Sequence, residues 1–405
     1  MSKLFQLPRP FSMSLLASAF AVSGLLAASN VSAANTTSTT ASSAANATSA
    51  DSAAKSTAQI AAVSNTVELV FVLDTTGSMG GLLEGAKSKI WGIINEILQK
   101  RSARNTHVKV GLVGYRDRGD SYVTKVTPLS DNLDDVYAQL MAFRAEGGGD
   151  MPEDVRSAMQ DALQKVGWSK PAANVSQIMF LVGDAPPHED YKDVLDPSSS
   201  AKQARALGMI INTIQCGNIR ETTLPWRNIA QYGGGEYFAI AQDGGVQNIA
   251  TPYDVELAAL GEKIGGTYMA YGRSEMRVAK KAKQAALESS VAMAAPAPVA
   301  AERAVNKALN KSAYDEADLL QKLESGSATL SSVKEAELPD ELRALKPEER
   351  QAKVDKSVAE RKALRARILE LSKQREQFLA EATRKAGKQQ GFDAAVAAAL
   401  AKQIK

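Results

Sequence analysis

Oxygen-bearing side chains gather in three short segments of the sequence. VELVFVLDTTGSMGG covers residues 67–81 and turns abruptly from apolar to polar, GGGDMPED lies further along, and VGDAPPHED follows another apolar stretch. The candidate ligands in these segments are Asp74, Thr76, Ser78, Asp150, Glu153 and Asp184. Carboxylate and hydroxyl oxygens suit Mg²⁺, Mn²⁺ or Ca²⁺, and no Cys and His cluster that would favour zinc accompanies them. The pattern predicts a site for a hard divalent cation.

The elements around these segments predict how the oxygens come together. Apolar runs alternate with amphipathic segments over residues 66–272, which is typical of an α/β, Rossmann-like fold with a mostly parallel six-stranded sheet and helices on both faces. The expected strands are residues 67–73, 108–115, 122–129, 178–182, 209–214 and 236–240. The short segment RDRGDS predicts that the second and third form an antiparallel hairpin at one edge. Ligands of such sheets bind at the carboxyl ends of the strands, where all three polar segments stand.

The arrangement resembles a known family. Asp74-x-Thr76-x-Ser78 after an apolar strand looks like the metal-ion-dependent adhesion site (MIDAS) of von Willebrand factor type A (vWA) domains. DMPEDVRSAMQ and MFLVGDAPPH resemble the corresponding loops of integrin β subunits. The resemblance covers residues 66–272 and implies that the Thr76 and Ser78 hydroxyls bind the metal directly. It also implies that Asp74 and Asp184 bind directly or through water, and that Glu153 supplies the oxygen of the middle loop.

The departures from the family pattern bear on the number of cations. Most vWA domains have a threonine in the middle loop, whereas this chain offers Asp150 or Glu153. Glycines 80, 81 and 148 stand at ligand positions of the additional cation sites of integrin β subunits. We therefore expect one divalent cation, Mg²⁺ before Mn²⁺ or Ca²⁺, with a second cation near Asp150 as the alternative. The family resemblance implies a coordination position left open for an Asp or Glu carboxylate of a protein partner, and hence metal-dependent docking or adhesion.

Other functions have less support in the sequence. Asp74 could instead cap the first helix, and Asp184 could be a turn residue. Ser78 lacks a G-x-S-x-G context, the bases available to a serine hydrolase are His107 and His188, and HExxH and P-loop motifs are absent, so we expect no enzyme. His188 is expected to be a loop histidine at the rim of the site. A scaffold acting through C-terminal helices is the second hypothesis, and a metal-dependent hydrolase the third.

The flanking segments predict export. Residues 1–33 have a basic start, an apolar run and a small-x-small cleavage site, as in a signal peptide, and residues 34–65 are an Ala/Ser/Thr linker expected to be disordered. We expect a periplasmic or secreted protein without a membrane span in the mature chain. Residues 273–338 form an Ala-rich helical or linker region. Residues 339–405 form a charged helical region, either a helical hairpin or a short coiled coil that could make a homo-oligomer.

The composition narrows the range of partners. Lys and Arg total 48 against 45 Asp and Glu, so the formal net charge is +3 and gives no general reason to bind nucleic acid or an anionic membrane. Cys216 is the single cysteine, which excludes a disulfide within the chain. The expected partner is another protein.

Overall fold

The computed structural model describes residues 65–101, 106–386 and 391–404. These residues belong to one compact unit, Ile60–Lys405, and the predicted signal peptide and all but the last residue of the predicted linker lie outside the described residues.

Six strands of the described residues form one sheet, in the order β3-β2-β1-β4-β5-β6. Their bounds are β1 (Asn65–Asp74), β2 (Thr106–Tyr115), β3 (Thr124–Ser130), β4 (Val175–Gly183), β5 (Ile210–Cys216) and β6 (Gly234–Ile240). All neighbouring pairs are parallel except β2 and β3, which form the antiparallel edge. The predicted fold class is confirmed, and each predicted strand overlaps an observed one, with differences at the strand ends.

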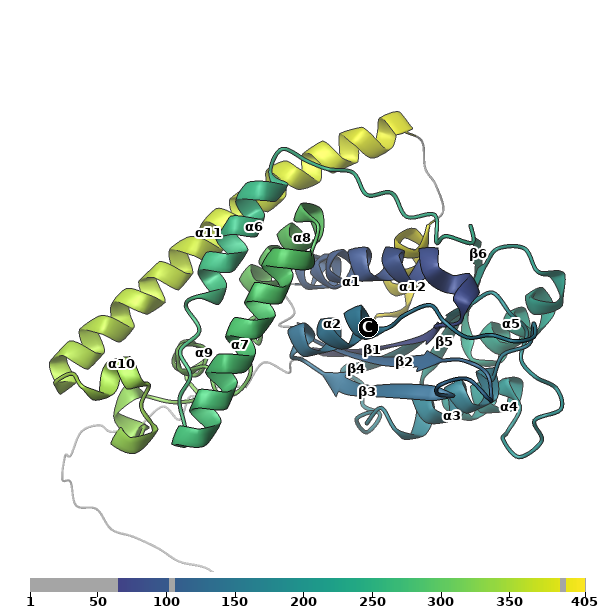
Figure 1. The fold of residues 1–405 in the computed structure, drawn as a ribbon, viewed down its shortest axis with the longest axis horizontal. Coiled ribbons are helices and arrows are strands. Elements are labelled where there is room, and N and C mark those ends of the chain that lie inside the picture. Colours follow the sequence, from purple (N-terminus) through teal and green to yellow (C-terminus); the bar gives the residue numbers. More distant parts are fainter. Residues whose placement is uncertain (1–64, 102–105, 387–390, 405) are drawn as a thin grey trace, which may run out of the picture. The chain divides into compact units, whose positions relative to one another are not determined.

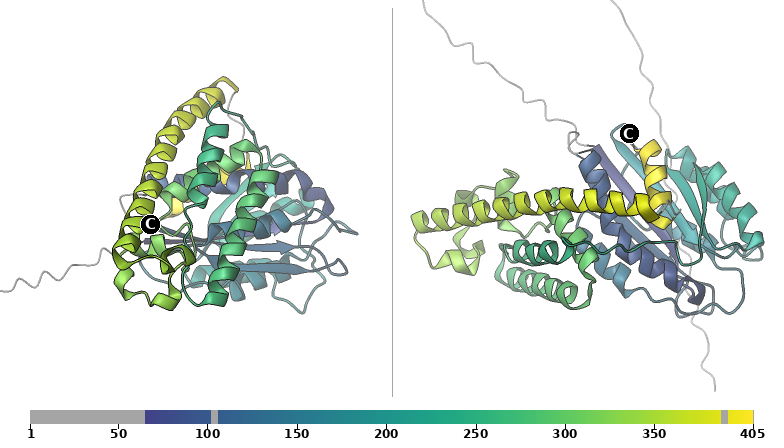
Figure 2. Two further views of the ribbon diagram at one scale, coloured as in Figure 1. Left: turned by 60° about the vertical axis from the view of Figure 1, so that its left-hand side comes forward. Right: turned by 90° about the horizontal axis from the view of Figure 1, so that it is seen from above.

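Helices cover both faces of this sheet (Figures 1 and 2). One face packs against α1 (Gly80–Lys100), α2 (Leu133–Ala142) and α12 (Phe392–Gln403), and the other against α3 (Val155–Gln164), α4 (Pro197–Ala206) and α5 (Arg220–Tyr232). In β1, Leu69 and Phe71 belong to the first core, whereas Val70 and Val72 belong to the second. Since both faces are buried, the strand is apolar at every position rather than at alternate ones.

The C-terminal part of the chain is helical, as predicted. It contains α6 (Asp254–Gly265), α7 (Ser274–Ala294), α8 (Ala297–Leu309), α9 (Leu319–Glu324), α10 (Asp340–Arg343) and α11 (Pro347–Ala386). Leu257 and Ile264 of α6 form a core with residues of α8 and α11, including Val305 and Ile368. α8 also packs against α1, and α11 is one 40-residue helix that lies beside α6 (Figure 1). The long helix therefore buries Ile368 and Leu371 against other helices of this chain, and the predicted coiled coil stays a prediction.

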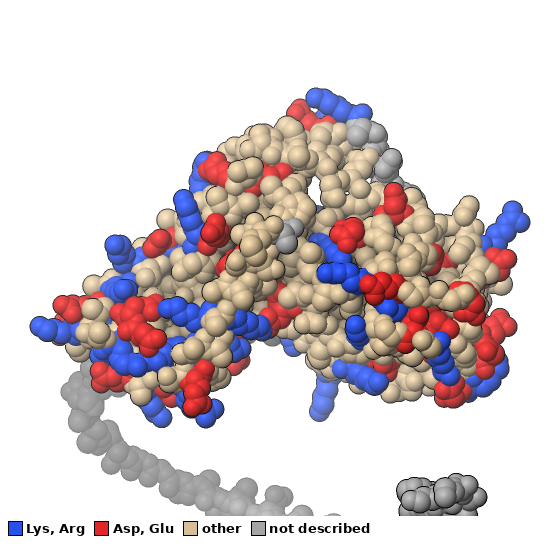
Figure 3. Space-filling model, viewed as in Figure 1, with Lys and Arg blue, Asp and Glu red and all other residues tan. Residues whose placement is uncertain are grey.

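Charges are mixed on the surface. Acidic and basic side chains are interspersed over the face shown in Figure 3, in keeping with the nearly balanced composition. Within the described ranges, every helix is too short or too polar to cross a bilayer.

Candidate metal centre

Three loops meet at the carboxyl edge of the sheet. β1 ends at Asp74 and β4 lies beside it in parallel, so Asp74 and Asp184 come to the same edge. Backbone hydrogen bonds join the loops: Gly77 N–H donates to the Gly147 carbonyl at 3.1 Å, and Glu153 N–H donates to the Pro186 carbonyl at 3.0 Å. The polar segments that are far apart in the sequence are thus held together by main-chain contacts.

A cavity of about 230 Å³ opens between these loops. The predicted ligands that line it are Thr76, Ser78, Asp150, Glu153 and Asp184. Ser78 is exposed, whereas Thr76, Glu153 and Asp184 are buried, so the cavity has a buried polar floor and an accessible hydroxyl. The structure brings these five side chains to one place, and their binding to a metal stays a prediction.

Asp74 is fully buried next to this cavity. Its Oδ1 accepts hydrogen bonds from the Thr76 N–H at 2.8 Å and from the Thr76 hydroxyl at 2.6 Å. Its Oδ2 has no hydrogen-bond partner among the described residues. Burial raises the pKa of Asp74 to about 7, although the hydrogen bonds from Thr76 act in the opposite direction. The residue preceding α1 is Met79, so Asp74 is not the cap of that helix.

The middle loop presents its two acids differently. Glu153 is 3% exposed, and its Oε2 is buried without a hydrogen-bond partner in the described part of the chain. Burial, followed by the charges of Asp74 and Asp117, raises the pKa of Glu153 to about 9. The Asp150 side chain is 61% exposed and lies 3.8 Å from a ring nitrogen of His188. Glu153 is therefore the better candidate for the middle-loop ligand.

The buried oxygens fit a divalent cation. Burying a carboxylate oxygen without a hydrogen-bond donor costs free energy of folding. A cation that prefers oxygen ligands can bind several such oxygens at once and remove this cost. Asp74 Oδ2 and Glu153 Oε2 are such atoms, and the Thr76 and Ser78 hydroxyls, 3.4 Å apart, add neutral oxygens. The donor set is all oxygen, as the sequence predicts.

Two supporting residues were not predicted. Gln242, in the loop after β6, donates from its side-chain amide to Asp184 Oδ2 at 2.6 Å and to the Ser78 carbonyl at 3.3 Å. Tyr115 lies under the site: a Cβ added at Gly183 would come within 2.5 Å of the Tyr115 hydroxyl, so only glycine fits there. Neither residue belongs to a recognisable motif, because each acts through contacts with distant segments.

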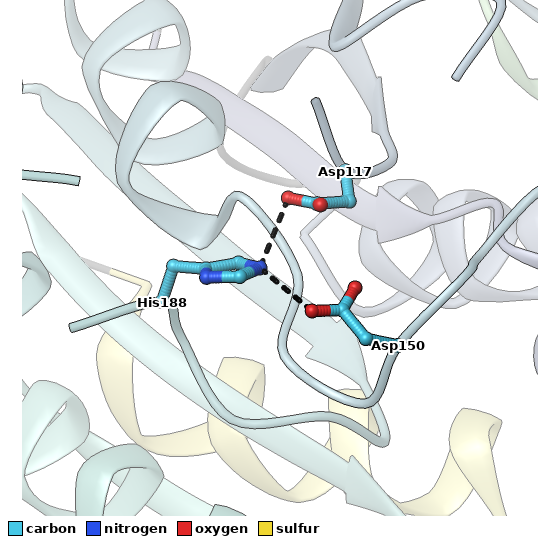
Figure 4. A group of neighbouring side chains, drawn as sticks. All are labelled: Asp117, Asp150 and His188. Carbon is cyan, nitrogen blue, oxygen red and sulfur yellow. Dashed lines mark ion pairs between the residues drawn. The ribbon is translucent and has the colours of Figure 1, made fainter. Parts of the chain in front are cut away.

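A second group of side chains with metal-binding chemistry lies beside the cavity. Asp117, Asp150 and His188 each offer one atom within 4.8 Å of the others (Figure 4). His188 is buried, 8% exposed, rather than on the rim as expected from the sequence. Asp117 follows β2 and was not singled out, since nothing in its sequence context marks it.

Comparison with known proteins agrees with the fold. Residues 68–252 match the family model described as von Willebrand factor A domain. The chain is 28% identical over 200 residues to the human (Homo sapiens) von Willebrand factor A domain-containing protein 7, covering 47% of this chain and 21% of that protein. It is 31% identical over 117 residues to an ariadne-like RING finger protein of Acanthamoeba polyphaga mimivirus, covering 29% and 11%. The chain thus spans about a fifth or less of the length of either relative.

Among solved structures, similar chains include the SpRpn10 VWA domain, with a TM-score of 0.32, 14% identity, and coverage of 44% of this chain and 88% of that chain. Another is proximal thread matrix protein 1 of the mussel byssus with a zinc-occupied MIDAS motif, with a TM-score of 0.31, 14% identity, and coverage of 44% and 42%. With the family match and the observed sheet order, residues 68–252 of this chain are a von Willebrand factor A domain.

Proposed function

We propose that this chain is an exported, non-enzymatic protein whose vWA domain binds one divalent cation and, through it, an Asp or Glu side chain of a protein partner. Asp74, Thr76, Ser78, Glu153 and Asp184 would hold the cation at a MIDAS. The observation that carries the proposal is the pair of buried oxygens without donors, Asp74 Oδ2 and Glu153 Oε2, beside a cavity lined by hydroxyls.

The donor set supports docking rather than catalysis. The Thr76 and Ser78 hydroxyls do not neutralise the cation, and with Asp74 and Asp184 acting through water the cation would keep more positive charge to attract a foreign carboxylate. The cavity opens to solvent through Ser78 and Asp150, both exposed. The formal net charge of +3 is nearly balanced, which favours recognition at the site itself over long-range steering.

Thermal unfolding in chelator and in Mg²⁺, Mn²⁺ or Ca²⁺ tests the cation site. A cation at 100 times its dissociation constant stabilises the folded state by about 2.7 kcal/mol. Asp74→Asn removes the charge of the most buried ligand and is expected to abolish this gain. Glu262→Gln removes an exposed acid on α6, away from the site, and should keep it. Equal stability of the wild-type protein in chelator and in all three cations would refute the site.

Docking of an acid is tested separately. Mn²⁺ bound with an open position relaxes water protons, and an added carboxylate that takes that position reduces the effect. We expect acetate to lower the relaxation enhancement of the Mn²⁺-loaded protein, whereas acetamide does not. Unchanged relaxation in acetate would leave a cation site without a docking function.

Export is tested by the N-terminal sequence of the protein recovered from cells, which should begin near residue 34.

A further inference from the structure

The group formed by Asp117, Asp150 and His188 has the organisation of a metal site of its own. The three residues come from the loop after β2, the loop before α3 and the loop after β4. His188 Nε2 lies 3.3 Å from Asp117 Oδ1 and 3.8 Å from Asp150 Oδ2, and Figure 4 shows both carboxylates directed at this nitrogen. Asp117 is 7% exposed, so the group is open mainly on the side of Asp150.

The other ring nitrogen of His188 decides which atom faces the carboxylates. Nδ1 lies 2.8 Å from Asp190 Oδ1, and because a carboxylate accepts hydrogen bonds, we assign the ring proton to Nδ1. Nε2 then carries a lone pair. It is buried and forms no hydrogen bond with any residue the structure describes. A histidine that donates one N–H to a carboxylate and directs its other nitrogen at a cation is the usual arrangement of a metal ligand.

The ring and one carboxylate are held in place by their neighbours. The His188 ring stacks on Tyr191 with centroids 4.0 Å apart and planes at 10°. The Tyr191 hydroxyl donates to Asp117, 3.0 Å from both carboxylate oxygens, and the Arg118 guanidinium lies 3.9 Å from the centre of the Tyr191 ring. His188 N–H donates to the Glu153 carbonyl at 3.2 Å. Such support lowers the cost of ordering the ligands on binding.

The two carboxylates of this group have no lysine or arginine partner in the described part of the chain. The Arg118 side chain is paired with Asp154 and Asp193. Within the described ranges, neither Asp117 nor Asp150 forms an ion pair with a lysine or arginine; each pairs only with His188. Two carboxylates therefore face a buried imidazole nitrogen that has no hydrogen-bond partner in the described part of the chain, and the Tyr191 hydroxyl is the side-chain donor to Asp117.

We propose that Asp117, Asp150 and His188 form a second cation site, for a transition-metal ion such as Zn²⁺ or Co²⁺. Imidazole nitrogen prefers these ions to Mg²⁺ or Ca²⁺, whereas the neighbouring all-oxygen site prefers the hard cations. The second site does not depend on the first, since the two sets of ligands differ and only Asp150 borders both. An ion bound at the second site would hold the loop before α3 in place, and Glu153 of that loop contributes to the first site.

Cobalt binding tests this proposal, because Co²⁺ bound through nitrogen has visible absorption bands. The untagged full-length protein is titrated with Co²⁺ in excess Mg²⁺. We expect one Co²⁺ per chain, with affinity reduced at least 100-fold in His188→Gln and 10–100-fold in Asp190→Asn, which loses the orienting charge. Asp74→Asn should bind Co²⁺ like the wild type. His107→Gln is the matched control, because His107 is the other histidine and lies at the start of β2.

Either of two results would overturn the proposal. One is a wild-type protein that binds no Co²⁺ in excess Mg²⁺, as expected if the His188 ring only pairs with the two carboxylates. The other is equal Co²⁺ affinity in His188→Gln and His107→Gln. Circular dichroism checks that each variant folds. Should His188→Gln not fold, Asp190→Asn decides, because the Asp190 side chain is 75% exposed and its substitution leaves the core intact.

Discussion

Two buried carboxyl groups control how the vWA site responds to pH. With the pKa of Glu153 raised to about 9 and that of Asp74 to about 7, Glu153 carries a proton at neutral pH when no cation is bound. A cation must displace that proton, so Mg²⁺ affinity should rise about tenfold per pH unit between pH 7 and 9, with about one proton released. Calorimetric titration in buffers of different ionisation enthalpy counts the protons.

The control for this prediction is Glu153→Gln, which should bind Mg²⁺ weakly and with a flatter dependence on pH.

The same pKa shifts predict how the stability of the cation-free protein depends on pH. Both folded-state pKa values lie above those of unfolded carboxyls, so without cation the folded state binds more protons and loses stability as pH rises from about 4 to 9. Urea unfolding in chelator should show lower stability at pH 8 than at pH 5. A higher value at pH 8 would contradict these carboxyl assignments.

Among the elements, α8 connects the helical region to the vWA domain through one buried arginine. Arg303 of α8 donates to both oxygens of Asp134 in α2, each at 2.6 Å, and also to Glu288 of α7. The Arg303 and Asp134 side chains are 3% and 6% exposed. Arg303→Met leaves a buried carboxylate without its partner, so we expect a loss of roughly 3–5 kcal/mol in the free energy of unfolding, measured with urea.

A matched variant separates burial from charge. Arg367 of α11 pairs with Glu256 of α6, but these side chains are 44% and 51% exposed. Arg367→Met should therefore change the free energy of unfolding by no more than about 1 kcal/mol. Similar losses in both variants would mean that burial of the Arg303 contact is not what holds α8 in place.

At the scale of the whole molecule, the end of the chain completes the core of the vWA domain. α12 packs on the sheet face beside α1, where Phe392 is 1% exposed with its ring centroid 6.0 Å from that of Phe71. Phe392 N–H also donates to the Gly244 carbonyl, in the loop that contains Gln242. Phe392→Ala should destabilise the protein by roughly 3–5 kcal/mol, through lost burial and the cavity left behind.

Thermal or urea unfolding measures this loss, and Phe378→Ala is its control, because Phe378 of α11 is 38% exposed. We expect Phe378→Ala to cost much less. If the two substitutions cost the same, α12 would not be part of the vWA core in solution, and residues 68–252 would be expected to fold without it.

Local patterns in the sequence were sufficient to predict the sheet and the loops that carry the site. A strand buried on both faces is apolar at every position, and the parallel βα arrangement brings the ends of β1 and β4 to one edge, so Asp74, Thr76, Ser78 and Asp184 were predictable as neighbours. These features depend on short stretches of chain and on rules that hold for any parallel sheet.

Contacts between distant segments could be identified only from the tertiary structure. The choice of Glu153 over Asp150 depends on which side chain is buried, and the grouping of Asp117 with His188 depends on how two loops lie across the site. α12 was predictable as a helix, but its Ala-rich sequence does not specify the surface that it covers. The physical reason is that burial and side-chain proximity arise from the packing of the whole chain, whereas strand and loop patterns are set by neighbouring residues.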